Sequence, residues 1–516
     1  MKTNNDYPLY NVPEISNLKE LVAYVADAYS DQPAFIYQRE KQTISVSYSR
    51  FKYDIDMLGL AFLENGLHGA KIALLGENSY EWVVTYLAVV NSGNVIVPID
   101  KELTAVEIRS LIDHSGSDAI VYSDSYADIA AGLLEDGAAI RHYFNMQQIP
   151  ALVDLGSRLV DDREASVSGE DIDENALAAL MYTSGTMGEP KGVMLSHRNL
   201  ACNAVADCKN VLFPDSSLLV LPLHHSAGFM GVLGMLIYGS AITINSSLKN
   251  LVSDFGECKP GIVVLVPQII ETLYRQTRAL ATSTTAKNPI AAARLVFGEK
   301  LSVILSGGAH LEGSLVEGYL DFGITVLNGY GLTECAALIS INRNHDFLPA
   351  SVGRVVPCCE VMISHPDEAG HGEICVRGDN VMLGYYKDEE ATRQAFDGEW
   401  LKTGDLGYLD ADGFLFVTGR KKNLIILSNG KNVSAEELET AIQRALPYVL
   451  EVVVFGVDDS IVAEVYLDPN VSDAPTRLPA DMIKLNRSLA SFKNIDRTVV
   501  RETEFPKTTT KKIRRG

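Results

Sequence analysis

The sequence predicts an α/β fold: a large N-terminal domain of helix-covered sheets with a small β-barrel-like subdomain, followed by a small α+β C-terminal domain. Short apolar strands alternate with helices in the first part of the chain, which is typical of parallel sheets covered by helices. From residue 353 to 417 the pattern changes to short strands and glycine turns, and a new unit begins near residue 419. We therefore expect domains at 1–420 and 421–516 in this chain of 516 residues.

The first part of the chain is expected to alternate regularly between helices and strands. The elements up to residue 122 are helix 17–29, strand 71–75, helix 79–91, strand 95–98, helix 102–113 and strand 119–122. The two strands around helix 79–91 form a βαβ unit. Residues 125–175 are irregular and rich in acidic side chains, so we expect a surface connection there.

The alternation resumes after residue 196. The expected elements are helix 198–207, strand 218–222, helix 229–238, strand 262–266, helix 267–277, strand 302–305 and helix 313–321. In the C-terminal unit, residues 419–423 read as a short polar linker. Ser434 and Glu437 form a capping box that opens a helix, which Pro447 ends. Strands 452–455 and 462–467 and a Lys/Arg-rich tail follow.

The composition is that of an acidic globular protein. Hydrophobic residues make up 47% of the chain and charged residues 21%, which allows a sizeable core. The net charge of −22 argues against a general affinity for nucleic acid or for an anionic membrane surface. The seven cysteines are scattered without a CxxC pair, so we expect reduced thiols and a cytoplasmic location. We expect neither a signal peptide at residues 1–16 nor an integral membrane segment.

Residues 180–196 carry the first chemical signal. They read LMYTSGTMGEPKGVMLS, which is an apolar strand, a segment rich in hydroxyls and glycine, and a second apolar strand. Glycines let backbone N–H groups approach an anion closely, hydroxyls add donors, and Lys191 adds a charge. An ordinary β-hairpin turn explains the same residues. A Walker loop does not, because Lys191 is followed by Gly192 and a strand rather than by a helix.

Four later clusters accompany this segment in a fixed order. They read PLHHSAG at 222–228, NGYGLTE at 328–334, WLKTGD at 400–405 with Gly-Arg at 419–420, and PKTTTKKI at 506–513. Together they closely resemble the adenylate-forming superfamily of acyl- and aryl-CoA synthetases, peptide-synthetase adenylation domains and beetle luciferase. The resemblance covers nearly the whole chain. The Leu-Pro-Leu-His-His run and the Ser-Asn-Gly-Lys-Asn-Val run also resemble bacterial long-chain fatty acid–CoA ligases.

The resemblance implies two half-reactions. A carboxylate first attacks the α-phosphate of ATP to give an acyl-AMP and pyrophosphate, and a thiol then attacks the acyl-AMP. The implied cofactors are ATP, Mg²⁺ and CoA, or the phosphopantetheine of a carrier protein in place of CoA. The 180–196 segment would hold the β- and γ-phosphates through Thr183, Ser184, Gly185, Thr186 and Lys191.

The resemblance also implies an adenine site. Tyr330 would lie against the base, Asn328 would contact its edge, and Thr333 would touch the α-phosphate. Glu334 would bind Mg²⁺ together with Thr186. The remaining small residues beside the base are Gly307, Gly308, Ala309 and Gly329.

Residues near the end of the chain complete the expected site. Alone, Asp405 would read as a surface carboxylate, but in the family it accepts hydrogen bonds from both ribose hydroxyls, assisted by Arg420. Lys512 would bridge the carboxylate and the α-phosphate and offset the charge of the transition state. The preceding residue is usually glycine in the family and is Lys511 here, while Ile513 sets the register on Lys512.

Three further roles follow from the resemblance. His225 would lie near the carboxylate and gate its approach rather than act as a general base, with His224 at a position that is often aromatic. Lys422 falls at the hinge, about which the small domain is expected to rotate after adenylation. That rotation would remove Lys512 and bring Gly430 toward the pantetheine arm, although a plain β-turn explains Gly430 equally.

The acid substrate is expected to be apolar and without a free amine. Residues 226–235 read SAGFMGVLGM and contain no acid to pair with an α-ammonium group. We interpret Gly231 and Gly234 as leaving room along the pocket wall, with adaptable methionines beside them, which favours a fatty acyl chain over a compact aryl ring. Loading of an acyl carrier protein is the alternative function. A nucleotide-binding protein that has lost catalysis is a further one.

Overall fold

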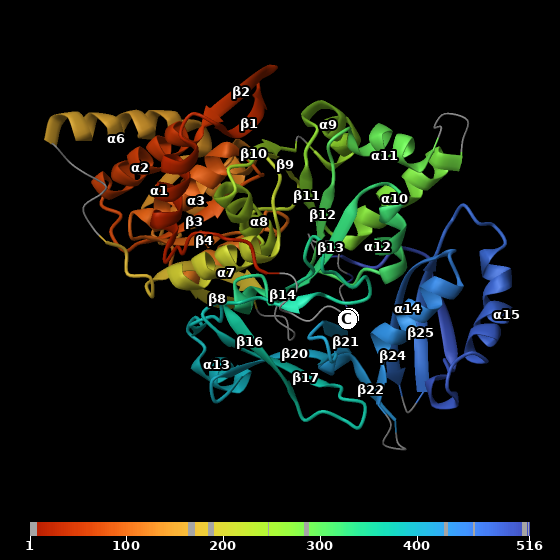
Figure 1. Ribbon diagram of the computed structural model, residues 1–516. Helices are drawn as coiled ribbons and strands as arrows, with labels where there is room; N and C mark the ends of the chain where they lie inside the picture. The colour runs from red at the N-terminus through yellow and green to blue at the C-terminus, as the bar shows by residue number, and fades with distance from the viewer. Residues whose placement is uncertain are drawn as a thin grey trace. The chain divides into compact units, whose positions relative to one another are not determined.

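The computed structural model describes residues 8–163, 171–183, 190–245, 247–282, 288–427, 432–457, 460–507, 513 and 515 (Figure 1). The chain divides into two compact units, which are taken here one at a time. Unit 1 comprises Met1–Glu360 and Val376–Glu399, and unit 2 comprises Val361–Cys375 and Trp400–Gly516. Among the described residues, no helix is both long enough and apolar enough to cross a membrane.

A seven-stranded sheet in unit 1 confirms the predicted βαβ alternation. Its order is β18-β8-β7-β4-β3-β5-β6. The strands are β3 (Lys71–Leu75), β4 (Val95–Pro98), β5 (Ala119–Tyr122), β6 (His142–Asn145), β7 (Leu177–Thr183), β8 (Lys191–Ser196) and β18 (Gly384–Tyr385). Strands β3 to β7 pair in parallel, whereas β8 runs antiparallel to both β7 and β18. Helix α3 (Tyr80–Asn91) links β3 to β4, and α4 (Ala105–Ser115) links β4 to β5.

A nine-stranded sheet forms the other half of unit 1. Its order is β15-β14-β13-β12-β11-β9-β10-β1-β2. The strands are β1 (Pro33–Arg39), β2 (Gln42–Ser47), β9 (Ser216–Leu219), β10 (Ala241–Ile244), β11 (Ile262–Leu265), β12 (Val303–Ser306), β13 (Thr325–Tyr330), β14 (Ser340–Ile341) and β15 (Arg354–Val355). The six strands from β13 to β1 in this order pair in parallel, so the ends of β12 and β13 that carry predicted site residues lie at one edge of the sheet.

Several helices of unit 1 begin at a side chain that caps them. Asn17 accepts from the backbone of Glu20 at the start of α1, and Asn288 does the same for α11. The other helices not yet given are α2 (Tyr48–Glu64), α5 (Ala127–Glu135), α6 (Ile149–Arg163), α7 (His197–Asn210), α8 (Ser226–Ile237), α9 (Leu251–Cys258), α10 (Pro267–Thr282), α12 (Gly313–Leu320) and α13 (Glu389–Ala395), with α1 at Leu18–Tyr29 and α11 at Pro289–Phe297.

The expected surface connection at 125–175 is wrong. This part of the chain forms α5, β6 and α6 before the described residues break off at 163. Figure 1 shows α6 running beside α2, and the two helices pack together. Gly156 permits this contact, because a Cβ there would lie 1.9 Å from the carbonyl oxygen of Met57. The glycine therefore serves close helix packing rather than a loop.

Apart from β18, the strands from residue 359 to 420 form a five-stranded sheet in the order β16-β17-β20-β19, with β21 paired to β20. They are β16 (Cys359–Ser364), β17 (Gly372–Gly378), β19 (Phe396–Asp397), β20 (Trp400–Leu409) and β21 (Leu415–Arg420). This agrees with the short strands predicted there. The expected polar linker at 419–423 is instead the end of β21 and a 3₁₀ turn at Lys421–Asn423.

The remainder of unit 2 has a hydrophobic core of its own. A three-stranded sheet of β24 (Val449–Val457), β25 (Ser460–Leu467) and β26 (Arg497–Arg501) packs with α14 (Ala435–Ala445) and α15 (Ala474–Asn486). A two-stranded sheet of β22 (Leu424–Ile426) and β23 (Asn432–Ser434) precedes α14. Ser434 caps α14 by accepting from the backbone N–H of Glu437, which confirms that half of the predicted capping box, whereas the Glu437 carboxylate pairs with Lys493.

Candidate active site

The predicted phosphate segment lies at the end of a β-hairpin in unit 1. Strands β7 and β8 are antiparallel, and Thr183 at the end of one faces Lys191 at the start of the other. The hairpin itself is therefore confirmed. The three predicted site residues between them, Ser184, Gly185 and Thr186, fall at 184–189, outside the described residues.

Tyr385 connects this hairpin to Glu334. Strand β18 pairs with β8, which places Tyr385 opposite Val193. The ammonium of Lys191 lies over the Tyr385 ring, 4.8 Å from its centroid, and the Tyr385 hydroxyl donates a 2.9 Å hydrogen bond to Oε1 of Glu334. Burial and then the Glu334 carboxylate raise the pKa of Tyr385, so its hydroxyl stays protonated and keeps donating.

Sequence reasoning missed Tyr385. It lies in a two-residue strand far along the chain from the 180–196 segment. No pattern in the sequence predicts that this strand pairs with β8. The backbone strengthens the link, because the N–H of Met382 donates to the carbonyl oxygen of Glu334 at 2.8 Å. Two predicted site residues, Lys191 and Glu334, thus both contact Tyr385.

The two predicted adenine-side segments belong to adjacent strands of the nine-stranded sheet: 307–309 directly follows β12, and 328–330 forms the end of β13. Ser306 at the end of β12 lies opposite Asn328 in β13. Oδ1 of Asn328 and Oγ of Ser306 are both buried without a hydrogen-bond partner among the described residues. Buried polar atoms normally have partners, so two orphaned oxygens side by side indicate a place where a polar ligand is received.

Small residues leave the backbone of these segments uncovered. A Cβ built on Gly307 would meet nothing closer than 3.9 Å, and one built on Gly308 nothing closer than 4.0 Å. Gly308 also has φ of +86°, which L side chains rarely adopt. Ala309 completes the turn out of β12. A flat ring could lie against backbone here, as the resemblance implies.

The segment after Tyr330 is held in a tight and strained turn. A Cβ on Gly331 would lie 1.8 Å from the carbonyl oxygen of Ala337, so only glycine fits. Ala336 and Ala337 have φ of +55° and +111°, unusual values for residues with a side chain. The turn carries Thr333 and Glu334 in a 3₁₀ turn at Thr333–Cys335 and is closed by the N–H of Ile339 donating to Tyr330. Gly329 precedes it, with Leu338 and Ser340 nearest its Cβ position.

Helix α8 meets this turn at its first residue. Ser226 Oγ lies 3.5 Å from Oγ1 of Thr333, and His225 is the N-cap residue of α8. From Gly228 to Ile237 the helix is buried, as expected of a core helix or a pocket wall. The expectation that Gly231 and Gly234 leave room along it is wrong. A Cβ on Gly234 would lie 2.8 Å from the Phe213 ring, and one on Gly231 would lie 3.2 Å from Val264, so neighbouring side chains already take this space.

His224 and His225 lie against Asp100, which follows β4. Nε2 of His224 is 3.3 Å from Oδ1 of Asp100, and the two imidazole centroids are 4.3 Å apart. The His224 side chain is only 4% exposed, and its Nε2 has no hydrogen-bond partner among the described residues. Burial, and then His225 and Lys101, hold the pKa of His224 well below its usual range, so its imidazole is neutral.

In unit 2 the two predicted ribose residues form a pair. Asp405 in β20 and Arg420 in β21 are directly opposite each other, and Nε of Arg420 lies 2.9 Å from Oδ1 of Asp405. The Asp405 side chain is 7% exposed and that of Arg420 is 47% exposed. Thr403 accepts from the N–H of Asp405 and donates to the carbonyl oxygen of Ile374, which fixes this end of the strand. Asp405 lies in the predicted region of short strands, whereas Arg420, expected in a polar linker, instead ends β21.

The tail residues that flank Lys512 are anchored in unit 2, whereas Lys512 itself and Gly430 lie outside the described residues. Lys507 and Ile513 form an antiparallel bridge, and Lys507 pairs with Glu451. Arg515 pairs with Glu439 on α14. Both ends of the segment that carries Lys512 are thus fixed to one core.

Lys422 lies in the 3₁₀ turn at Lys421–Asn423. Burial, and then the neighbouring Arg420 and Arg515 guanidiniums, lower its pKa. Three cations therefore gather at the position predicted as the hinge.

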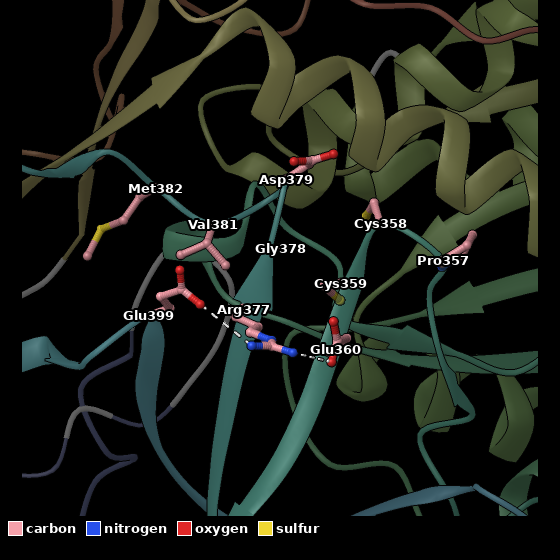
Figure 2. A pocket seen from close by; sticks show the side chains of 10 residues that line it. All are labelled: Pro357, Cys358, Cys359, Glu360, Arg377, Gly378, Asp379, Val381, Met382 and Glu399. Atoms are coloured by element: carbon pink, nitrogen blue, oxygen red, sulfur yellow. Dashed lines mark hydrogen bonds and ion pairs between the residues drawn. The ribbon is translucent and has the colours of Figure 1, made fainter.

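A shallow pocket of about 550 Å³ lies in unit 1, and no predicted site residue lines it (Figure 2). Arg377 crosses its floor between two carboxylates, 2.9 Å from Glu360 and 3.5 Å from Glu399. Cys358 and Cys359 form part of its wall. Hydrogen bonds from Cys202 and Cys359 lower the pKa of the Cys358 thiol.

Comparisons with known protein families match nearly the whole chain. Residues 22–386 match the family described as AMP-binding enzyme, and residues 422–516 match the family described as AMP-binding enzyme C-terminal domain. Together these matches cover parts of both units, and the described site residues Asp405 and Arg420 fall between the two matches.

Curated relatives and solved structures agree with the family matches. The chain is 31% identical over 489 residues to the long-chain-fatty-acid–CoA ligase FadD15 of Mycobacterium bovis, covering 84% of this chain and 80% of that protein. It is 28% identical over 563 residues to the long-chain-fatty-acid–CoA ligase of Salmonella typhimurium, covering 99% and 96%. Its fold is similar to the o-succinylbenzoate coenzyme A synthetase MenE of Bacillus subtilis in complex with ATP and magnesium ion, with a TM-score of 0.76, 26% identity, and 96% and 98% coverage.

Proposed function

The chain belongs to the AMP-binding enzyme family, and we propose that it activates an apolar carboxylic acid as an acyl-adenylate and transfers the acyl group to the thiol of CoA. The observation that carries this proposal is the joining of separate predicted segments in unit 1. Tyr385 links Lys191 with Glu334, and Thr333 meets the start of α8. The segment 307–309 directly follows Ser306, which lies opposite Asn328 in the nine-stranded sheet. A nucleotide, a cation and an acid all need these segments close together.

Each unit offers candidate ligands for the nucleotide. Asn328 offers an orphaned oxygen to the amino edge of adenine, and Tyr330 offers a ring to its face. Asp405, which is oriented by Arg420, would accept hydrogen bonds from the ribose hydroxyls. Thr183, Ser184, Gly185, Thr186 and Lys191 would hold the β- and γ-phosphates.

The proposed reaction needs a negatively charged ligand for Mg²⁺ and a positively charged side chain beside the reacting carboxylate and α-phosphate. Glu334 has a hard carboxylate oxygen of the kind that Mg²⁺ prefers, and Thr186 would add a hydroxyl. Mg²⁺ bound there would neutralise phosphate charge. Lys512 would stabilise the charge that builds between the carboxylate and the α-phosphate. The described residues Lys507 and Arg515, on either side of Lys512 in the sequence, are anchored to the core of unit 2.

The acid would enter beside His225 and lie along α8. Because α8 is buried and has no acidic residue at 226–235, an amino acid would leave its ammonium unpaired. The names of the two curated relatives support a fatty acid. The aryl acid in the name of the MenE neighbour keeps an aromatic substrate as the competing choice. Gly231 and Gly234 do not help to distinguish a fatty acid from an aromatic acid, because neighbouring side chains occupy the space beside them.

We propose further that the domains divide at residue 420 and that Lys422 is the hinge. The C-terminal family match begins at residue 422, which supports this boundary. A rotation at this point would exchange Lys512 for the segment around Gly430 between the two half-reactions. All seven cysteines are free thiols, which supports the reducing cytoplasm as the working compartment.

The decisive experiment measures pyrophosphate release over a panel of fatty and aryl acids, with and without CoA. We expect release with long apolar acids and acyl-CoA formation when CoA is present. If the acid is adenylated but the acyl group is transferred only to a carrier-protein thiol, the acceptor is a carrier protein and not CoA. No release with any acid would refute the proposal and favour a nucleotide-binding protein without catalysis.

Lys512→Ala tests the proposed mechanism within the same assay. We expect it to abolish pyrophosphate release while sparing thioester formation from supplied acyl-AMP, because Lys512 would act only in the first half-reaction. Lys511→Ala is the matched control and should retain both steps. Equal loss of both half-reactions in Lys512→Ala would contradict the assigned role.

A further inference from the structure

Asp100, His224 and His225 form a compact group of metal-ligating side chains, called here the Asp–His–His cluster. Each residue offers one ligand atom, and these atoms all lie within 4.8 Å of one another. The residues come from two positions far apart in the sequence: Asp100 follows β4, and the histidines precede α8. Among the described residues, these three side chains have the donor types and the spacing to hold a cation.

The spacing inside the cluster is that of ligands around a small cation. Zinc binds imidazole nitrogen and carboxylate oxygen at about 2.0–2.1 Å, so two ligands of a tetrahedral ion lie about 3.3 Å apart. Nε2 of His224 and Oδ1 of Asp100 are 3.3 Å apart. They do not form a hydrogen bond with each other, although the nitrogen is buried. A buried nitrogen without a partner would be satisfied by an ion between the two atoms.

The donor set selects the class of ion. Two imidazole nitrogens and one carboxylate oxygen suit Zn²⁺, Co²⁺ and similar ions, whereas Mg²⁺ prefers oxygen ligands and water. Three protein ligands would leave one position of a tetrahedral ion for water or for a small ligand. His225 is partly exposed and can rotate to complete the set. Lys101, beside Asp100, is a neighbouring cation and would weaken the site.

We propose that the Asp–His–His cluster binds a divalent transition-metal ion of the Zn²⁺ class, and that the bound ion inhibits acyl-adenylate formation by immobilising His225. The binding step stands on the geometry alone. The inhibitory effect rests on the proposed function, in which His225 gates the approach of the carboxylate. The site is distinct from the proposed Mg²⁺ site, which uses Glu334.

The first experiment titrates the full-length protein with Co²⁺ and records its visible ligand-field absorption. We expect one equivalent to bind with the intense bands of a low-coordinate ion and to be displaced by Zn²⁺ but not by Mg²⁺. Asp100→Asn and His224→Gln should each weaken binding more than about tenfold, since even an outer-shell partner of a metal costs about 10- to 100-fold. Lys101→Gln should tighten binding by removing the nearby cation.

His310→Asn is the matched control. His310 also lies beside a carboxylate, 3.4 Å from Glu312, but His310 is exposed, and among the described residues no third metal-ligating side chain joins this pair. This variant should bind Co²⁺ like the wild type. Absence of a ligand-field band, or a band that survives Asp100→Asn in a protein of unchanged circular dichroism, would overturn the site.

The second experiment measures pyrophosphate release at saturating Mg²⁺-ATP with increasing Zn²⁺. We expect wild type and His310→Asn to be inhibited at the Zn²⁺ concentration that displaces Co²⁺, and Asp100→Asn to resist at least about tenfold more Zn²⁺. Metal binding without inhibition would overturn the inhibitory role. Metal binding by a protein that releases no pyrophosphate with any acid would support the site and contradict the proposed function, so the two failures are distinguishable.

Discussion

The hydroxyl of Tyr385 donates a 2.9 Å hydrogen bond to the carboxylate of Glu334. A carboxylate held in this way has one oxygen committed to the protein and keeps the other free to bind a cation. Because Lys191 also lies over the Tyr385 ring, a single side chain orients both a predicted phosphate ligand and a predicted Mg²⁺ ligand. Tyr385 is therefore a positioning residue for the nucleotide end of the site.

Tyr385→Phe should impair use of Mg²⁺-ATP while the protein remains folded. A hydrogen bond to a charged group contributes about 1.5–3 kcal/mol, so kcat/KM for ATP should fall on the order of 10- to 100-fold. The Mg²⁺ concentration needed for half-maximal rate should rise as well. Tyr386→Phe is the matched control, because the Tyr386 hydroxyl donates to the carbonyl oxygen of Ser115 instead. Equal kinetics for Tyr385→Phe and wild type would contradict the positioning role.

The Asp405–Arg420 pair should act as a unit in ATP binding. Asp405→Asn is expected to raise KM for ATP about tenfold or more, since Asn offers one acceptor where the carboxylate has two. Arg420→Gln should have a smaller effect, and the double variant should be no worse than Asp405→Asn, because Arg420 acts through the carboxylate it holds. Initial rates against ATP concentration measure all three.

A control for this pair lies in the same hairpin. Asp410 accepts from the backbone of Asp412 and Phe414 in the turn between β20 and β21, and Asp410→Asn should leave KM unchanged. Fully additive effects of the two substitutions at 405 and 420 would show that these residues contact the nucleotide independently.

Gly331→Ala should destabilise unit 1. Its Cβ would lie 1.8 Å from the Ala337 carbonyl oxygen, so the strained turn has to open, which we expect to cost about 3 kcal/mol of unfolding free energy. Gly307→Ala is the comparison, because its Cβ would meet nothing within 3.9 Å. It should keep its unfolding free energy within about 0.5 kcal/mol while raising KM for ATP. Urea unfolding followed by circular dichroism separates the two; similar midpoints for both variants would refute this account of the turn.

Asp207 makes stability depend on pH. It is buried in α7 with Oδ1 unpartnered among the described residues, and burial raises its pKa to about 7 from an ordinary value of 3.8. A raised pKa means that the folded state favours the protonated acid, so its stability contribution is present below the unfolded pKa and is lost as pH rises toward 7. Between pH 5 and 8 this group should remove about 3 kcal/mol of unfolding free energy.

Asp207→Asn should abolish that loss. Urea unfolding at pH 5 and pH 8 should show the variant more stable than wild type at pH 8 and much closer to it at pH 5. Asp128→Asn, at an exposed position on α5, should keep the wild-type pH dependence. A wild-type slope that persists in Asp207→Asn would assign the titration to another group.

Much of the fold could be predicted because local patterns decided it. The strands flanking α3 have the apolar runs of a buried parallel sheet, and Ser79 caps the helix between them. The hairpin that pairs Thr183 with Lys191 follows from two apolar runs around a turn-forming segment. Ser434 likewise marked the start of α14 correctly.

The rest depended on long-range packing that a local pattern does not contain. Helix α6 has Gly156 in its middle, and this glycine is explained only by its close approach to the backbone of Met57, which the sequence does not show. The sequence alone suggests open space at Gly234, but the Phe213 ring occupies that space. Tyr385 and Asp100 have no local signal at all, because their partners Glu334 and His224 lie far away in the sequence. Such residues are found only when the sheet registers are known.

The pairing of β18 with β8 also constrains how the protein is made. Strand β8 is complete once residue 196 has been synthesised, but its outer edge stays unpaired until residues 384 and 385 emerge from the ribosome. During that interval the nascent chain presents an open strand edge, which is a template for intermolecular pairing. A fragment that stops before residue 384 would keep this edge permanently exposed. Residue 386 is therefore the earliest sensible C-terminus for an expressed fragment that contains the hairpin.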